Sequence, residues 1–365
     1  MRVLHLDTEK TWRGGENQLR LLHLGLQERG FQSSVACVPA SEVARRLEPL
    51  GPVIPIKRGG YDLATAFLLA RQVRAGAFQV IDAHTAATHS LGLLVKKLVP
   101  QVKLVVHRRV DNPIKHQLVT RWKYLSPGVD HYVAISAAIG EILRHYGLGS
   151  ERISVVKSAT EMGRFKTEEK IQAKKRFADQ WGLSTQALWI GNASALDSQK
   201  DPLTLVQAFA RLRQKTSQEV ALVLAGEGDL RPQIEGLVER LGLAAHVRLV
   251  GFRRDVRDFL LALDLVALPS VNEGLGTTLL DSLLCGCAVV ATRVGGIPEI
   301  IVEGITGLLV QPQDPDGLAN CLIRLMENLE ERKRLVEASC LHVTSHFSVD
   351  AMVEGNLAVY RKLLV

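Results

Sequence analysis

The sequence predicts an α/β fold made of two doubly wound domains, each built on a parallel β-sheet. Short apolar runs rich in β-branched residues alternate with amphipathic stretches along the whole 365-residue chain. Many of these runs are apolar at every position, which is typical of parallel strands covered by helices on both faces. The chain is also longer than a single hydrophobic core usually supports, so two domains are expected.

The strands are expected where the apolar runs are shortest. In the first half of the chain these runs are Val3–Leu6, Val35–Val38, Lys103–His107, His131–Ile135 and Ile153–Val156. In the second half they are Ala187–Ile190, Val220–Ala225, Val247–Val250, Leu265–Leu268 and Ala288–Ala291. The repeated alternation of strand and helix predicts a Rossmann-like unit in each half.

Helices are expected where leucine, valine, isoleucine and phenylalanine recur at helical spacing. Such stretches are Asn17–Arg29, Asp62–Ala75, Leu203–Arg213 and Arg231–Leu241. A polar segment after the strand Ile153–Val156 predicts a domain boundary, which we place between residues 163 and 164. The domains are then 1–163 and 164–348, and we expect the final helix, 349–365, to pack back on the first domain.

Composition narrows the classes of function. The net charge is +7, and residues 1–165 carry 23 Lys and Arg against 13 Asp and Glu, whereas residues 166–365 carry 22 against 25. This basic half suits a phosphate-rich acceptor or the surface of an anionic membrane, or it is simply a solvated basic face. Aromatic residues make up only 5% of the chain and show no basic-aromatic pattern, so no nucleic-acid partner is expected.

Cellular location is expected to be cytoplasmic, with possible peripheral contact at the inner face of a membrane. The five cysteines are odd in number, and Cys285 and Cys287 do not have the spacing of a zinc or redox pair. Asp7 and Glu9 interrupt the region where a secretion signal would be apolar. The sequence shows no uncharged apolar window long enough to span a bilayer.

A glycine pair follows the first predicted strand. Gly14 and Gly15, within the run Arg13–Asn17, let the backbone approach a ligand, and free amides at a helix start favour an anion. If this glycine pair is functional, it contacts a diphosphate or an acceptor substrate. The alternative is that the two glycines only allow a tight turn. The glycine fingerprint of dinucleotide-binding folds is absent here, which argues against a nicotinamide-dependent oxidoreductase.

Two further positions lie after predicted strands. His84, in the run Asp82–His84, could bind a sugar hydroxyl or move a proton, although a lone histidine is more often structural. Lys200 precedes a helix that begins near Asp201 and could neutralise a phosphate, although most lysines are simply solvated.

The most specific motif is the run Glu273–Asp281, which follows the strand Leu265–Leu268. Glu273 could accept hydrogen bonds from sugar hydroxyls, and the carboxylate of Asp281 suits ribose hydroxyls. The residues between them form a flexible turn and a helix start whose amides could face donor phosphates. This part of the predicted site consists of Gly274, Leu275, Gly276, Thr277 and Thr278.

These residues resemble the retaining glycosyltransferases of family 4, which have the GT-B fold. The similarity covers nearly the whole chain and is strongest from residue 187 to 315. It rests on the order and spacing of five runs, Ala225–Asp229, Leu249–Phe252, Glu273–Asp281, Val294–Ile301 and Glu303–Pro315. The resemblance implies two facing Rossmann-like domains with an inter-domain cleft, the first for the acceptor and the second for the donor.

The resemblance also implies roles for single residues. Glu273 and Asp281 match the two acids of the family motif, contacting the donor sugar and the ribose. Lys200 matches the phosphate-binding lysine, Gly14 and Gly15 the glycine loop, and His84 the catalytic histidine. The nucleotide base is expected near Arg253. Glu273 and Lys200 are accordingly expected in catalysis as well as in donor binding.

The implied reaction moves a hexose-type sugar from a nucleotide-diphosphate sugar to a cell-envelope glycan or glycolipid, such as lipopolysaccharide. The resemblance implies no metal ion and no cofactor, with the nucleotide sugar as donor substrate. Two departures stand out, since Asp281 replaces a glutamate and Ala195 replaces an arginine that usually binds the diphosphate. Arg108 or Arg109 is a hypothetical source of the missing charge.

Two other interpretations stay open. A GT-B sugar-nucleotide epimerase would share the architecture, although the run Glu273–Asp281 argues against it. A non-catalytic scaffold or binding subunit is favoured by the missing arginine.

Overall fold

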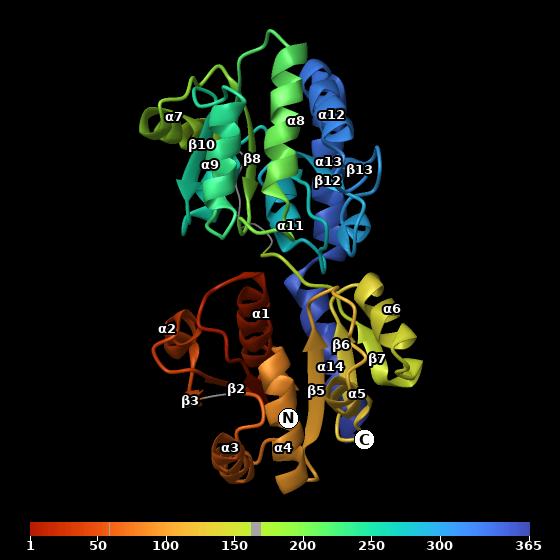
Figure 1. Cartoon of the computed structure of the whole chain (residues 1–365). Coiled ribbons are helices and arrows are strands. Elements are labelled where there is room, and N and C mark those ends of the chain that lie inside the picture. Colours follow the sequence, from red (N-terminus) through yellow and green to blue (C-terminus); the bar gives the residue numbers. More distant parts are fainter. Residues whose placement is uncertain (58, 162–168) are drawn as a thin grey trace. The chain divides into compact units, whose positions relative to one another are not determined.

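The chain forms two compact units, which we describe separately (Figure 1). The structure, a computed structural model, describes residues 1–57, 59–161 and 169–365. Unit 1 consists of Met1–Ala159 and Val349–Val365, and unit 2 of Thr160–Ser348. The boundary that the sequence predicts between residues 163 and 164 lies outside the described residues. The last helix belongs to unit 1.

Unit 1 is built on a seven-stranded sheet in the order β3-β2-β1-β4-β5-β6-β7, and all its recorded strand pairs are parallel. The strands are β1 (Arg2–Leu6), β2 (Gln32–Cys37), β3 (Val53–Pro55), β4 (Val80–Ala83), β5 (Lys103–Arg108), β6 (His131–Ala134) and β7 (Ile153–Val155). The α-helices are α1 (Gly14–Glu28), α2 (Glu42–Leu47), α3 (Leu63–Ala75), α4 (Ala86–Leu98), α5 (Leu118–Leu125), α6 (Ala137–His145) and α14 (Val349–Leu364).

Helix α14 completes the core of unit 1, although it is far from the other elements in sequence. Val353, Leu357 and Tyr360 of α14 are fully buried in one cluster with leucines of α1 and valines of β1, β4, β5 and β6. In Figure 1 the blue α14 lies close to the dark red α1, and the Cβ that an alanine would carry at Gly25 of α1 would stand 2.5 Å from Val353. The helix is therefore an integral part of the layer over one face of the sheet.

Unit 2 is built on a six-stranded sheet in the order β10-β9-β8-β11-β12-β13, again with parallel pairs. Its strands are β8 (Leu188–Ala193), β9 (Val220–Ala225), β10 (Val247–Gly251), β11 (Leu265–Leu268), β12 (Ala288–Thr292) and β13 (Leu308–Val310). The α-helices are α7 (Lys170–Trp181), α8 (Pro202–Lys215), α9 (Arg231–Arg240), α10 (Val256–Ala262), α11 (Thr277–Leu284), α12 (Pro315–Glu327) and α13 (Leu329–His346).

The predicted fold class, two Rossmann-like domains with parallel sheets, is confirmed. The ten predicted strands all form, with ends that differ by up to three residues. Strands β3 and β13 were not predicted, and β4 was expected only as a strand before His84, without bounds. Helix α1 begins at Gly14 rather than at Asn17, so the glycine pair forms its first turn. Within the described parts of the chain, every helix is too short or too polar to cross a bilayer.

Candidate functional site

Both sheets reverse their strand order at one place, and the predicted site residues lie beside these places. In unit 2 the reversal falls between β8 and β11, and in unit 1 between β1 and β4. Open α/β sheets bind ligands beyond the carboxyl ends of their strands at such a reversal, because the two following connections diverge there and leave a crevice. Each unit therefore contains one candidate site.

In unit 2, the structure brings together Lys200 and Glu273, which are 73 residues apart in sequence. Lys200 lies after β8, and its ammonium group forms an ion pair with Oε2 of Glu273 after β11. The hydroxyl of Ser270 lies 3.3 Å from the same carboxylate oxygen, and the amide of Gly296 donates to the carbonyl of Glu273 at 3.0 Å. Glu273 is buried; Lys200 and Ser270 hold its carboxylate, and Gly296 holds its backbone.

The turn that connects Glu273 to α11 needs a glycine. Gly276 precedes the helix with φ +88°, a left-handed conformation that side chains rarely adopt, and a Cβ there would stand 3.3 Å from Cγ of Glu273. Gly274 and Leu275 are buried beside it, and α11 begins at Thr277, as predicted. The first amide N–H groups of α11, including those of Thr277 and Thr278, have no hydrogen-bond acceptor within the helix itself. The motif therefore places helix-start amides a few residues after Glu273.

Asp281 has a protein partner. Its carboxylate accepts a hydrogen bond of 2.7 Å from the hydroxyl of Thr160, at the start of unit 2. A ribose contact, as predicted, would have to share or replace this bond. Sequence reasoning missed Thr160 because no motif marks it.

Ala195, which replaces the expected arginine, lies in a loop that packs against two glycines. A Cβ at Gly226 would stand 1.9 Å from the carbonyl oxygen of Ser194, and one at Gly228 would stand 2.3 Å from that of Leu196. The amide of Leu196 also donates to the carbonyl of Glu227 at 3.0 Å. The loops after β8 and β9 are therefore joined backbone to backbone, which fixes the segment that leads to Lys200.

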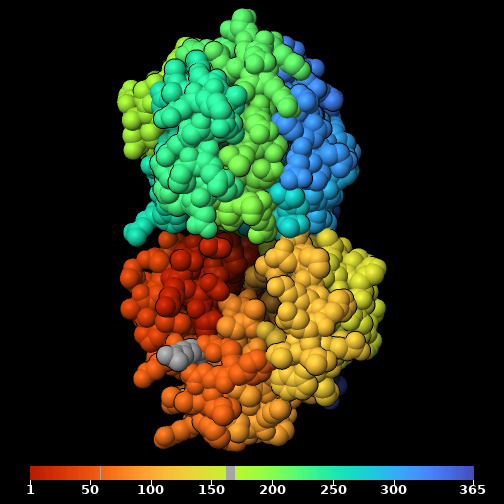
Figure 2. Space-filling model, in the orientation of Figure 1, coloured from red at the N-terminus to blue at the C-terminus, as the bar shows by residue number. Residues whose placement is uncertain are grey.

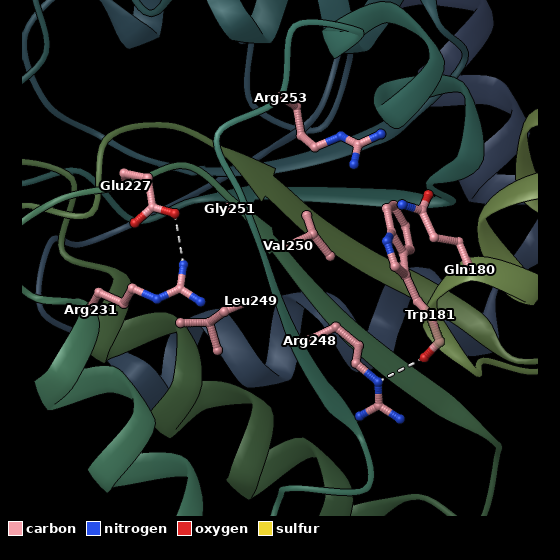
Figure 3. Close-up of a pocket in the computed structure, with 9 residues that line it drawn as sticks. All are labelled: Gln180, Trp181, Glu227, Arg231, Arg248, Leu249, Val250, Gly251 and Arg253. Carbon is pink, nitrogen blue, oxygen red and sulfur yellow. Dashed lines mark hydrogen bonds and ion pairs between the residues drawn. The ribbon is translucent and has the colours of Figure 1, made fainter.

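Arg253 borders a pocket of about 490 Å³ at the edge strand β10 (Figure 3). The guanidinium of Arg253 forms two hydrogen bonds with Asp255, at 2.9 and 2.6 Å, and lies 5.9 Å from the ring centre of Trp181. On the other side, Glu227 pairs with Arg231 at 2.9 Å. Lys200 and Glu273 do not line this pocket, so it is not part of their site.

In unit 1, the predicted glycine pair lies against an arginine. A Cβ at Gly15 would stand 3.4 Å from Cδ of Arg109, which follows β5. Glu16 is buried and accepts a hydrogen bond of 2.6 Å from the amide of Arg13, which fixes the start of α1. Arg108, the other candidate cation, donates to Tyr124 and to the carbonyl of Asn112. Arg109 is therefore the one of the two that lies at the glycine pair.

His84 lies within a buried network that the sequence did not predict. Its Nε2 is 3.3 Å from Oδ2 of Asp82 and 3.0 Å from Nδ1 of His5, and its Nδ1 is 2.9 Å from Nη2 of Arg109. Asp82 also contacts Nε2 of His107 at 3.1 Å and accepts a hydrogen bond of 2.5 Å from the hydroxyl of Tyr360. The side chains of His5, Asp82 and His84 are at most 1% exposed.

The charge state of this network follows from its surroundings. Burial lowers the pKa of His84 well below its usual range; Asp82 acts in the opposite direction, and His107 and Arg109 add to the lowering. Burial alone would raise the pKa of Asp82, but the surrounding imidazoles hold it well below its ordinary value. We therefore assign a carboxylate to Asp82, a neutral imidazole to His84 and a neutral phenol to Tyr360, whose pKa burial raises.

The network does not fit a metal ion, although His5, Asp82 and His84 offer three ligand atoms within 4.8 Å of one another. A metal on Nε2 of His84 would require the imidazole proton on Nδ1, which already faces an N–H of Arg109. Metal-bound histidines donate their second N–H to an acceptor, and an arginine has no acceptor to offer. For His5, a metal on Nδ1 would leave the second N–H on Nε2, and this atom has no hydrogen-bond partner among the described residues.

Comparison with known proteins identifies the family. The profile of "Glycosyltransferase Family 4" matches residues 12–161, and that of "Glycosyl transferases group 1" matches residues 173–340. The chain belongs to these glycosyltransferases. The predicted resemblance to family 4 is thereby confirmed, and the GT-B architecture of this glycosyltransferase agrees with that of its solved neighbours.

Two curated relatives of the glycosyltransferase differ in the activities that their names state. The D-inositol 3-phosphate glycosyltransferase of Corynebacterium urealyticum is 31% identical over 63% of the chain and 56% of that relative. The N-acetyl-alpha-D-glucosaminyl L-malate synthase of Bacillus anthracis is 26% identical over 83% of the chain and 80% of that relative. The chain spans little more than half the length of the Corynebacterium urealyticum relative and of the same enzyme from Thermobifida fusca, of which it covers 53%.

Two solved structures share the fold over almost the full chain. A glycosyltransferase from Rickettsia africae superposes with a TM-score of 0.88 at 20% identity, covering 100% of this chain and 98% of its own. HepE from Anabaena, solved in complex with UDP and glucose, gives a TM-score of 0.86 at 20% identity, covering 99% and 100%.

Proposed function

We propose that the protein transfers a hexose-type sugar from a nucleotide-diphosphate sugar to an anionic acceptor of the cell envelope. The observation that carries this proposal is the pairing of Lys200 with Glu273 at the strand-order reversal of unit 2. A cation, a fixed carboxylate and helix-start amides are the groups needed to bind a diphosphate and the hydroxyls of a sugar. Unit 2 is accordingly assigned to the donor and unit 1 to the acceptor.

The chemistry breaks the bond between the anomeric carbon and the diphosphate oxygen and forms a bond from that carbon to an acceptor oxygen. Charge develops on the leaving diphosphate, where Lys200 and the amides of Gly276–Thr278 would stabilise it. The acceptor hydroxyl passes its proton to a leaving phosphate oxygen, so atoms and charge balance. We propose retention of configuration by attack on the face that the diphosphate leaves. Asp281 and Arg253 are proposed to contact the ribose and the base.

An anionic acceptor is supported by the charge of the first half and by two relatives. Residues 1–165 carry an excess of Lys and Arg over Asp and Glu. The names of the two curated relatives include a phosphate and a dicarboxylate, inositol 3-phosphate and malate. We propose a cell-envelope glycan or glycolipid of this kind, lipopolysaccharide among them, as the acceptor of this chain.

Nucleotide-sugar binding tests the donor assignment. Lys200→Ala and Glu273→Ala should each weaken binding about 10- to 100-fold, because a charge-assisted hydrogen bond contributes about 1.5–3 kcal/mol. Ligand-induced shifts of the melting temperature report this when UDP-glucose, GDP-mannose and ADP-glucose are titrated. The matched control is Lys333→Ala, which removes an exposed lysine of α13 that pairs with Glu330. Wild-type protein that binds no nucleotide sugar and releases no nucleotide would favour the non-catalytic scaffold instead.

Contact with a membrane surface is supported by exposed apolar side chains on α3 and α5. Leu63, Phe67 and Leu68 of α3 are 59–61% exposed, and Leu118 of α5 is 86% exposed. The rings of Tyr61 and Trp122 lie 6.2 Å apart and join the two groups, which we call the α3–α5 patch. Both segments reach the surface of unit 1 in Figure 2. Lys97 lies 5.1 Å from the ring centre of Trp122. Other exposed basic residues lie on or near the same segments in sequence: Lys57, Arg71, Lys115 and Arg121.

We propose that the α3–α5 patch docks on anionic lipid at the cytoplasmic face of a membrane. Phe67→Glu combined with Trp122→Glu should abolish sedimentation with vesicles of phosphatidylglycerol and phosphatidylethanolamine. Leu341→Glu, at a 70% exposed leucine of unit 2, is the matched control and should bind like the wild type. Binding should weaken as salt rises. Equal binding to phosphatidylcholine vesicles, or binding that the double variant retains, would contradict the proposal.

A further inference from the structure

We propose that His84 is a positioning residue that orients Arg109, and that Arg109 contacts an anionic oxygen of the substrate at the Gly14–Gly15 pair. This inference rests on the proposed sugar transfer and changes the role predicted for His84, which was catalysis. It names a residue of unit 1, Arg109, as the group that meets the substrate.

The contact with Arg109 determines the tautomer of His84. A guanidinium carries only donors, so the 2.9 Å contact from Nη2 of Arg109 requires a lone pair on Nδ1 of His84. The proton of the neutral imidazole must then reside on Nε2, which lies 3.0 Å from Nδ1 of His5 and 3.3 Å from Oδ2 of Asp82, two atoms that can accept it. Adding a second proton to Nδ1 would place two donors face to face. His84 therefore has no free nitrogen with which to exchange a proton with a substrate.

The carboxylate of Asp82 anchors this arrangement from the other side. It accepts from Tyr360 of α14, at 2.5 Å, and contacts His5 of β1 and His107 of β5 at 3.2 and 3.1 Å. The charged groups that face His84 are thus Asp82 and Arg109, and the neighbouring imidazoles are His5 and His107. Such a fully buried chain of hydrogen bonds fixes the imidazole plane, and with it the guanidinium.

Arg109 keeps donors for a ligand. Only one of its five N–H groups is used by His84, and its Nε is buried without a partner among the described residues. Its side chain lies over Gly15, where a Cβ would stand 3.4 Å away, and beside the first turn of α1. A phosphate or carboxylate oxygen bound there would meet both the guanidinium and helix-start amides.

The first test observes His84 directly and needs no activity. Long-range ¹H–¹⁵N spectra of the full-length protein give the tautomer of each histidine, and His84→Gln identifies the His84 signals. We expect the Nε2–H tautomer with shifts that stay constant from pH 5.5 to 8.5. A protonated Nδ1, or a titration within this range, would overturn the inference even if sugar transfer is confirmed.

The second test separates positioning from proton transfer. Glutamine offers one acceptor and one donor but no titrating group, so His84→Gln should keep kcat within about 10-fold and leave the pH profile unchanged. His84→Leu and Arg109→Gln should each lower kcat by much more than about 10-fold. The double variant that combines these two changes should have a kcat no lower than that of the worse single variant, because the two residues act as one unit. His131→Gln, which replaces another buried histidine bonded to Ser154, is the matched control.

The outcomes distinguish this inference from the proposed function. A proton-transfer role would make His84→Gln lose about 100- to 10,000-fold and would remove one limb of the pH profile. Multiplicative losses in the double variant would show that Arg109 acts independently of His84. Absence of any transfer in the wild type would contradict the proposed function, while the spectra would still decide the orientation of His84.

Discussion

Asp7 is a buried carboxyl group at the carboxyl end of β1, only 1% exposed. Burial raises its pKa to about 7, although the amide of Glu9, which donates to it at 2.7 Å, acts in the opposite direction. Buried Glu16 and exposed Glu9 raise this pKa further, and Arg109 lowers it. Asp7 therefore titrates near neutral pH next to the candidate site of unit 1.

This shift predicts a pH-dependent stability. Because the folded pKa of about 7 lies above the ordinary value of 3.8, folded protein binds more protons than unfolded chain between these values. Stability should fall as pH rises through this range. Asp7→Asn keeps an oxygen that can accept from the amide of Glu9, but it has no titrating group. As pH rises from about 4 to 7, the unfolding free energy of the wild type should therefore fall relative to that of the variant by up to ~1.4 kcal/mol per pH unit.

Urea unfolding at pH 5, 6, 7 and 8 measures the difference. Glu337→Gln, at an exposed glutamate of α13, is the control and should follow the wild type at every pH. If the unfolding free energies of Asp7→Asn and wild type change in parallel with pH, then Asp7 is ionised in the folded protein throughout the range from pH 5 to 8.

Single residues were predictable from sequence where a motif names them. The motif match placed Lys200 and Glu273 in one site, and the structure brings them into contact. The partners of His84 were not predictable, because they depend on which strands are neighbours. His5 and Asp82 pair only because β1 lies beside β4 in register, a fact of sheet order and not of local sequence.

At the level of elements, the loops after β8 and β9 depend on a close approach that only glycine allows. Gly226 has φ +145° and faces the carbonyl of Ser194. Gly226→Ala should lower the unfolding free energy by about 2–6 kcal/mol, as overpacking and backbone strain act together. Nucleotide-sugar binding should weaken with it, because the loop leads to Lys200.

Gly236 provides the matched control, since a Cβ there meets nothing within 4 Å on helix α9. Gly236→Ala should raise the unfolding free energy by about 0.5–1 kcal/mol, because glycine is a poor helix residue. Urea unfolding of both variants checks the pair. Equal stability of Gly226→Ala and wild type would mean that the two loops do not meet as described.

At the level of the whole molecule, periodicity predicted both sheets and most of their strands. Continuous apolar runs are a strong signal for buried parallel strands, which explains the success. The short strands β3, β4 and β13 were not among the runs that the periodicity singled out. The identity of the acceptor could not be predicted either, because the side chains that bind an unknown ligand form no recognisable motif in a single sequence.

The return of α14 to unit 1 has a consequence for how the protein is made. A ribosome releases the chain from its first residue onward, and domains usually fold in that order as they emerge. Here the sheet of unit 1 is synthesised first, but Val353 and Tyr360, which fill its core, emerge after all of unit 2. Translation thus leaves the earlier unit with an uncovered apolar face until the later one has been completed, which reverses the usual order of maturation.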